Sequence, residues 1–206
     1  MDAKREALVD RLYQEGLRHD EAEPDRLRRY RNLEPDAAAL LAMLVRAIAA
    51  RSVLEIGTSN GYSTIWLADA VTWTGGRVTS VDNDPSVLAV ADQNLIDAGV
   101  RGVVDLVTAD GGAHLASAAD ATVDFLFLDA ERPEYAGWWP HPRRVLRPGG
   151  VLCVDNVLSH PDEVAPLVRL IGADPELAST TVAVGKGELL AVRRPHTTVG
   201  TSCRPE

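Results

Sequence analysis

The sequence predicts a doubly wound α/β fold, in which helices cover both faces of a mostly parallel sheet. Two observations lead to this prediction. From residue 52 onward, short apolar runs alternate with segments of helical period, which is typical of β-α-β crossovers. The apolar runs are hydrophobic throughout rather than at every second residue, as expected for strands that are covered on both faces. A chain of 206 residues is long enough to bury one sizeable core.

Residues 1–50 are expected to be helical and to form a lid or an interface joined to the core. Leu8, Leu12 and Leu17 recur close to helical spacing, with charged residues between them. Pro35 and Asp36 then begin a second, apolar helix that reaches residue 50.

Residues 51–194 are expected to form the main domain. Its predicted strands are 53–56, 77–81, 104–107, 123–128 and 151–154. Its predicted helices are 62–71, 85–98, 112–118, 135–146 and 161–171. Residues 147–150 predict a turn into the fifth strand, and the segments 181–184 and 189–192 predict a closing hairpin. Residues 195–206 have no periodicity, so we expect a disordered tail.

The composition excludes several classes of protein. The net charge is −9 at pH 7, which disfavours partners such as nucleic acid or an anionic membrane, because both require a basic face. No apolar run reaches the ~20 residues that span a bilayer, and the charged N-terminus carries no apolar signal segment. Cys153 and Cys203 frame neither a disulfide scaffold nor a metal cluster. We therefore expect a cytoplasmic enzyme or binding protein.

A glycine-rich turn at residues 57–61 follows the first predicted strand. Gly57 and Gly61 let a ligand approach the main chain at the carboxyl end of the sheet, where open α/β folds bind small molecules. The turn lacks the G-x-G-x-x-G spacing of a nicotinamide dinucleotide site. It does match the G-x-S-x-G elbow of α/β-hydrolases, with Ser59 as nucleophile and His160 as its partner. That elbow belongs after several strands, however, and the upstream oxyanion motif is absent.

Acidic residues follow the successive strands of the first half. Glu55 lies beside the glycine-rich turn, Asp82 closes the second strand, and Asp110 with Gly111 closes the third. An acid at the position of Asp82 accepts hydrogen bonds from ribose hydroxyls. Acids without a phosphate cradle suit a positively charged nucleoside. S-adenosylmethionine (SAM) has a ribose, an adenine, an ammonium and a sulfonium.

A second set of oxygen donors follows the fourth and fifth strands. Asp129 ends the fourth strand, and Asp155 and Asn156 end the fifth. Neighbouring strands lie ~4.8 Å apart, so the three side chains would converge at one edge if the chain turns at Asn156. Carboxylate and amide oxygens favour Mg²⁺, Mn²⁺ or Ca²⁺ over zinc.

Taken together, these motifs resemble the cation-dependent O-methyltransferases of the catechol and caffeoyl-CoA type, which are class I SAM enzymes. The similarity covers roughly residues 35–193 and rests on four segments: Val53-Leu54-Glu55-Ile56-Gly57-Thr58 with Gly61-Tyr62-Ser63, Asp129-Ala130-Glu131-Arg132 with Tyr135, Leu146-Arg147-Pro148-Gly149-Gly150, and Asp155-Asn156-Val157-Leu158.

The resemblance implies a Rossmann-like sheet of seven strands with an antiparallel strand from the last hairpin. It also implies metal-dependent methyl transfer to one hydroxyl of a vicinal diol, usually on an aromatic ring, by an enzyme that is often a homodimer. The metal would be held by Asp129, Asp155 and Asn156. The cofactor would be held by Glu55, Gly57, Thr58, Ser59, Gly61, Ser63, Asp82, Asn83, Asp110, Gly111, Asp129 and Glu131.

The sequence departs from the family pattern at two motifs. The family lysine that is assigned as general base is Arg132 here, and arginine stays protonated at any working pH. Arg132 would therefore stabilise a phenolate electrostatically beside Asp129, which leaves His160 as an alternative base. The family D-G of the last hairpin is Lys186-Gly187 here. Trp138 or Trp139 could form a wall for an aromatic substrate or belong to the core.

Two other functions stay open at the level of sequence. One is an RNA-modifying methyltransferase acting on a hydroxylated base, for which four arginines offer a local basic stretch, although a solvated helix face explains them more simply. These are Arg26, Arg28, Arg29 and Arg31. The other is a SAM- or nucleoside-binding protein without catalysis, since the family lysine is missing.

Overall fold

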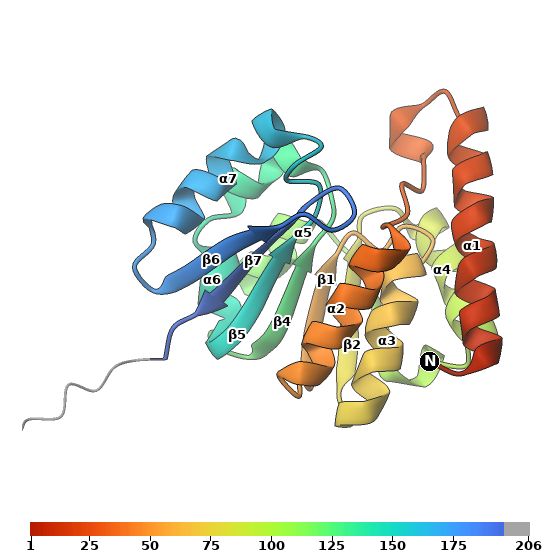
Figure 1. Ribbon diagram of the computed structural model, residues 1–206, viewed down its shortest axis with the longest axis horizontal. Helices are drawn as coiled ribbons and strands as arrows, with labels where there is room; N and C mark the ends of the chain where they lie inside the picture. Colours follow the sequence, from red (N-terminus) through yellow and green to blue (C-terminus); the bar gives the residue numbers. More distant parts are fainter. Residues whose placement is uncertain (196–206) are drawn as a thin grey trace, which may run out of the picture.

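The computed structural model describes residues 1–195 and contains one seven-stranded sheet between two groups of helices (Figure 1). The strand order is β3-β2-β1-β4-β5-β7-β6. Strands β1 to β5 pair in parallel, whereas β7 is antiparallel to both β5 and β6. This architecture confirms the predicted fold class. The strands are β1 (Ser52–Ile56), β2 (Arg77–Asp82), β3 (Val104–Thr108), β4 (Val123–Leu128), β5 (Leu146–Val154), β6 (Leu177–Val182) and β7 (Glu188–Arg193).

The strand order reverses between β1 and β4, and this reversal creates a crevice at the carboxyl ends of the strands. The register brings those ends level, because Ile56 pairs with Leu128 and Leu128 pairs with Val154. The chain segments that leave β1, β4 and β5 therefore start side by side.

Helices cover the two faces of the sheet as two separate layers. Alternate residues of β4 divide the core: Phe125 and Phe127 pack toward α1, α2 and α3, whereas Leu126 and Leu128 pack toward α5, η3 and α7. The helices are α1 (Ala3–Ala22), η1 (Arg26–Arg28), α2 (Pro35–Ala47), α3 (Tyr62–Thr74), α4 (Pro85–Asp97), η2 (Arg101–Val103), α5 (Gly111–Ser117), η3 (Arg132–Trp138), α6 (His141–Val145) and α7 (Pro161–Ala173).

The N-terminal segment packs on the main domain. Leu8, Val9 and Leu12 of α1 are buried in the same core as α2 and α3. After α1, residues 23–34, here termed the strap, fold back toward the carboxyl ends of the strands and include η1 (Figure 1). The helical prediction for residues 1–50 therefore holds for α1 and α2 and fails for most of the strap.

Three predicted elements differ from the structure. The helix expected at 135–146 is instead a 3-10 turn, η3, and the short helix α6, because Pro140 and Pro142 cannot donate helical hydrogen bonds. The turn expected at 147–150 lies inside β5, where the register with β4 shifts. β6 begins at Leu177, earlier than predicted. The sequence did not indicate this start because Ser179, Thr180 and Thr181 are polar and exposed, and so lack the apolar pattern of a buried strand.

Within residues 1–195, every helix is too short or too polar to cross a bilayer. The predicted tail lies outside the described residues from 196 onward, and so does Cys203. Cys153 is buried in β5 as a free thiol.

Candidate active site

A cavity of about 620 Å³ opens at the carboxyl ends of the strands and is bordered by the strap. This volume is typical of a small-molecule site. Most of the residues that the sequence nominated line it: Gly57, Thr58, Ser59, Ser63, Asp82, Asn83, Asp110, Gly111, Asp129, Glu131, Arg132 and Asn156. Glu55, Gly61 and Asp155 do not line it.

The glycine-rich turn is shaped by close backbone approach. Gly57 has a φ of +108°, and a Cβ on this residue would lie 2.0 Å from the carbonyl oxygen of Asp129. Gly61 has a φ of +83° and precedes α3, where a Cβ would lie 3.1 Å from that of Ala91. Glycine at position 57 is thus what allows the turn after β1 to touch the loop after β4.

Asp82 fastens the turn to β2. One of its oxygens accepts hydrogen bonds from the backbone nitrogens of Thr58 at 3.1 Å and Ser59 at 3.0 Å, and the other accepts from Asp84 at 3.1 Å. A carboxylate has about four acceptor positions, so Asp82 keeps capacity toward the cavity. Asp110 precedes α5 and caps its N-terminus, where its side chain accepts a hydrogen bond from the backbone nitrogen of Ala113 at 2.7 Å.

Glu55 lies beneath the cavity and is fully buried. Its carboxylate accepts hydrogen bonds from the hydroxyls of Ser63 at 2.6 Å, Thr64 at 2.5 Å and Ser80 at 2.6 Å. Burial raises the pKa of Glu55 to about 7, and the three hydroxyls limit the rise. The structure therefore gives Glu55 a role in supporting the turn, and its direct contact with a cofactor stays a prediction.

The predicted oxygen donors after β4 and β5 are neighbours. The backbone nitrogen of Asp129 donates a hydrogen bond to the carbonyl oxygen of Ile56 at 3.0 Å, and that of Asp155 donates to the carbonyl oxygen of Leu128 at 3.2 Å. The hydrogen bonding between neighbouring strands therefore continues past the strand ends. Asn156 has a φ of +68°, which is the turn that the sequence analysis required. Asp129 and Asn156 line the cavity, and Asp155 is buried next to them.

The charges of this acidic group disfavour one another. Burial and the neighbouring Asp155 raise the pKa of Asp129 well above its ordinary value. Burial and the nearby Glu188 raise the pKa of Asp155 to about 8. Glu188 is itself fully buried, and its Oε1 has no hydrogen-bond partner among the described residues.

These residues fit a hard cation in their chemistry. Within residues 1–195, no three His, Cys, Asp or Glu side chains are arranged as a metal cluster, so an ion here would depend on the amide of Asn156 as well as on two carboxylates. In the structure, the backbone and side-chain nitrogens of Asn156 both donate to Asp155. Buried, mutually repelling carboxylates gain most from a divalent cation.

The loop that carries Asp129 is held by Tyr135. The Tyr135 hydroxyl accepts from the nitrogen of Ala130 at 2.6 Å and donates to its carbonyl oxygen at 3.1 Å. Two residues further on, Arg132 is 5% exposed and donates to Glu163 of α7 at 2.8 Å. A permanently charged guanidinium is therefore fixed at the cavity wall next to the Asp129 loop.

Trp138 forms part of the wall and of the core. A Cβ on Gly112 would lie 2.5 Å from its indole, so the glycines that begin α5 allow this packing. Trp138 lines the cavity with 9% of its surface exposed, whereas Trp139 does not line it.

The strap supplies a wall that the sequence did not reveal. The carboxylate of Asp20 accepts hydrogen bonds from the backbone nitrogens of Tyr30 and Arg31, each at 2.7 Å. The hydroxyl of Ser59 donates a hydrogen bond to the carbonyl oxygen of Tyr30 at 3.0 Å. The four arginines of the strap all line the cavity, and only two of them lie in the short turn η1. Interpreting them as a helix face was therefore wrong. Lys186 and His160 also border the cavity.

The hydrolase interpretation finds no support in this geometry. The hydroxyl of Ser59 donates a hydrogen bond to the carbonyl oxygen of Tyr30, while Nδ1 of His160 lies 2.9 Å from the hydroxyl of Ser159. Ser59 and His160 thus have separate partners, and no nucleophile–base pair is formed between them.

Comparison with known proteins agrees with this geometry. A family model described as O-methyltransferase matches residues 10–194. A catechol O-methyltransferase from Niastella koreensis is 33% identical over 130 residues, which are 62% of this chain and 58% of the relative. A catechol O-methyltransferase from Mycobacterium tuberculosis is 39% identical over 118 residues, which are 57% of this chain and 53% of the relative. The chain thus spans little more than half the length of these two curated relatives.

A solved structure matches over a larger part of the chain. The O-methyltransferase TomG from Streptomyces achromogenes, in complex with SAM, superposes with a TM-score of 0.73 at 26% identity. The match covers 95% of this chain and 91% of that protein.

Proposed function

Because this chain belongs to the O-methyltransferase family, we propose that it transfers a methyl group from SAM to one hydroxyl of a catechol-like or vicinal-diol acceptor, assisted by a divalent cation. The observation that carries this proposal is the contact between two motifs. The turn at Gly57 touches the backbone of Asp129, which in turn follows the strand next to that of Asp155. A donor bound on the turn would lie next to a cation bound by the acids.

SAM as the methyl donor is supported by the polar groups on the turn side of the cavity. Asp82 and Asp110 line this side, and both are strand-end acids suited to a ribose or an adenine edge. The binding of SAM by a relative with this fold agrees with the same conclusion.

The reaction is an in-line displacement at the methyl carbon. The acceptor oxygen forms a bond to the methyl group while the carbon–sulfur bond breaks, and sulfur keeps the electron pair as S-adenosylhomocysteine. Alignment of the two substrates can contribute ~7–11 kcal/mol to such a reaction. Asp129, Asp155 and Asn156 would hold the cation, which when bound lowers the pKa of a coordinated hydroxyl.

The remaining charged groups suggest how the oxyanion is produced and stabilised. Arg132 cannot accept a proton, so we assign it electrostatic stabilisation of the phenolate. Burial lowers the pKa of His160, and the positive charge of Arg132 lowers it further, which keeps the imidazole neutral and able to accept the proton.

The test is a turnover assay with a panel of catechols. The purified chain is incubated with SAM and each catechol, with Mg²⁺ or with EDTA, and both S-adenosylhomocysteine and the methylated product are quantified. We expect product with Mg²⁺ and a loss of at least about 100-fold in EDTA, restored by added Mg²⁺. Asp129→Asn should cause a similar loss, whereas the surface variant Asp105→Asn should match the unchanged protein, because Asp105 pairs with Arg77 at an exposed site.

Three outcomes would contradict the proposal in different ways. Unchanged turnover in EDTA would remove the cation from the mechanism. Methylation of RNA with no methylation of catechols would favour the nucleic-acid alternative. Binding of SAM without transfer to any acceptor would favour a non-catalytic binding protein.

A further inference from the structure

A chain of alternating charges borders the cavity, and four of its five residues line it. Arg132 donates to Glu163 at 2.8 Å, Glu163 lies 3.8 Å from Arg26, Arg26 lies 3.2 Å from Glu131, and Glu131 lies 2.9 Å from Arg31. We term these five residues the mouth ladder. It joins the strap, the loop before η3 and helix α7, which are far apart in the sequence.

The mouth ladder carries unbalanced positive charge. Three guanidinium groups share two carboxylates, which leaves one net positive charge in a chain whose overall charge is −9. Arg28 and Arg29 also line the cavity, as do the acidic Asp84 and Glu134, and Lys186 lines it in a pair with Glu34 at 2.7 Å, so the unbalanced charge is that of the ladder itself. Asp20 also lines the cavity, and its carboxylate accepts hydrogen bonds from two backbone nitrogens of the strap.

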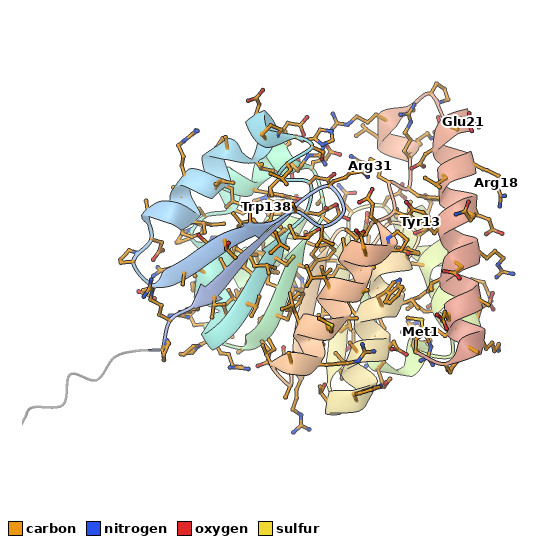
Figure 2. The ribbon with its side chains drawn as sticks, in the orientation of Figure 1. Met1, Tyr13, Arg18, Glu21, Arg31 and Trp138 are labelled. Atoms are coloured by element: carbon orange, nitrogen blue, oxygen red, sulfur yellow. The ribbon has the colours of Figure 1, made fainter. Side chains whose placement is uncertain are left out.

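The arginines of the ladder retain donors for a ligand. Each guanidinium has five N–H donors, and Arg26 and Arg31 are 51% and 35% exposed. Figure 2 shows Arg31 directed into the space between α1 and the C-terminal half, whereas Arg18 projects from the far side of α1. Leu27, between the arginines, lines the cavity with 72% of its surface exposed, so it offers an apolar contact to an aromatic ring.

We propose that the acceptor is an aromatic diol that carries an anionic substituent, in the simplest case a carboxylate, and that Arg26 and Arg31 bind that substituent. This proposal rests on the proposed function and names the class of its acceptor. A carboxylate matches the fork of a guanidinium, whereas a neutral ring gains nothing from the excess charge and a cationic one is repelled.

A small anion explains the arrangement better than RNA does. Binding of RNA needs an extended basic surface that follows many phosphates. The ladder is confined to one cavity mouth, and two of its three arginine charges are already neutralised by Glu131 and Glu163. One unbalanced charge suits a single carboxylate.

The test compares three acceptors that share one diol: 3,4-dihydroxybenzoate and 3,4-dihydroxybenzamide, which have nearly the same shape and differ in charge, and dopamine, which carries a longer, cationic aminoethyl group. We expect kcat/KM to fall in that order, with benzoate about fivefold above the benzamide, as for one partly exposed charge pair. The double variant Arg26→Gln/Arg31→Gln should reduce this ratio to about one. Arg18→Gln removes a charge outside the cavity and should leave the ratio unchanged.

A second variant separates charge from mere structural support. Glu163→Gln also breaks the ladder, but it frees positive charge and should raise the benzoate-to-benzamide ratio about threefold or more. If the ladder served only to hold the strap, both variants would move the ratio in the same direction. Equal kcat/KM for benzoate and benzamide, or a ratio that survives the double variant, would overturn the proposal.

Binding measurements keep this inference distinct from the proposed function. Calorimetric titration with 3,4-dihydroxybenzoate and with the benzamide, in the presence of S-adenosylhomocysteine, needs no turnover. Tighter, arginine-dependent binding of the benzoate without methyl transfer supports the ligand class and contradicts the function. Equal turnover of all three acceptors supports the function and overturns the ligand class. Arginine-dependent displacement of bound benzoate by a short RNA at micromolar concentration would also overturn it.

Discussion

The two sides of the cavity are held by different kinds of interaction. The turn side, residues 57–63 with Asp82 and Asp110, is fixed by backbone contacts, glycine conformations and backbone hydrogen bonds. On the strap side, backbone hydrogen bonds hold Tyr30 and Arg31, through Asp20 and Ser59, and the remaining links to the rest of the cavity are long side chains that pair at partly exposed positions, as in the mouth ladder. Backbone geometry tolerates little change, whereas exposed ion pairs can be exchanged at small cost. The comparison suggests that donor binding is rigid and that acceptor choice is adjustable.

The most damaging change on the turn side should be Gly57→Ala. The added Cβ would lie 2.0 Å from the Asp129 carbonyl at a φ of +108°, so the two loops must separate. We expect a loss of about 3–5 kcal/mol in the free energy of unfolding and no measurable binding of SAM. Thermal denaturation and calorimetry measure the two effects. Gly99→Ala is the matched control, since it has a φ of +68° with nothing within 4 Å and should lose only about 1–2 kcal/mol.

The result for Gly57→Ala can also contradict the contrast between the two sides of the cavity. If Gly57→Ala lowered the free energy of unfolding no more than Gly99→Ala does, the turn side would be as adaptable as the strap side. The rigid and adjustable sides would then not be distinct.

The next effect concerns pH and the support beneath the turn. Burial raises the pKa of Glu55 to about 7, so between its ordinary pKa of 4.5 and pH 7 the folded state holds a proton that the unfolded state releases. Stability should therefore fall as pH rises through this window and level off above it, by up to about 3 kcal/mol. Glu55→Gln removes this titration, and its unfolding free energy from urea titrations at pH 5 and pH 8 should differ less than that of the unchanged protein. An identical pH slope in both proteins would mean that Glu55 is ionised when folded.

Arg132 connects the two sides, and its substitution should have an intermediate effect. If charge is what the phenolate requires, Arg132→Lys keeps kcat within about threefold, whereas Arg132→Gln lowers it about tenfold or more. Because Arg132 meets Glu163 through a single 2.8 Å contact, lysine can make the same pair. Single-turnover rates with catechol and saturating SAM measure the effect. An equal collapse of both variants would instead indicate that the guanidinium geometry is required.

The contrast between the turn side and the strap side also separates what the sequence predicted from what it did not. The order of elements, the glycine turn and the acids at the strand ends follow from local sequence patterns, because the carboxyl ends of neighbouring parallel strands lie at the same edge of the sheet. The strap was missed, since Tyr30 and Arg31 are positioned by Asp20 and Glu131, and a pairing across 100 residues leaves no local signal. Lys186 was noted only as a departure from a motif, and its place in the cavity depends on the hairpin that ends at β7. Glu55 was predicted at the site, but its three hydroxyl partners could not be.

The smallest expected effect on stability is that of Arg31→Gln on the strap side. Its pair with Glu131 is 35% exposed on each partner, and exposed pairs contribute about 0.2–1 kcal/mol. We therefore expect the free energy of unfolding to fall by less than about 1 kcal/mol, comparable to Arg77→Gln, which removes the surface pair with Asp105. Hydrogen exchange should nevertheless separate the two, because Arg31→Gln loosens a segment with few buried contacts. The amides of Tyr30 and Arg31 should exchange faster in Arg31→Gln and unchanged in Arg77→Gln. A loss of several kcal/mol in Arg31→Gln would show that the strap is as firmly built into the fold as the glycine turn, and the contrast between the two sides would fail.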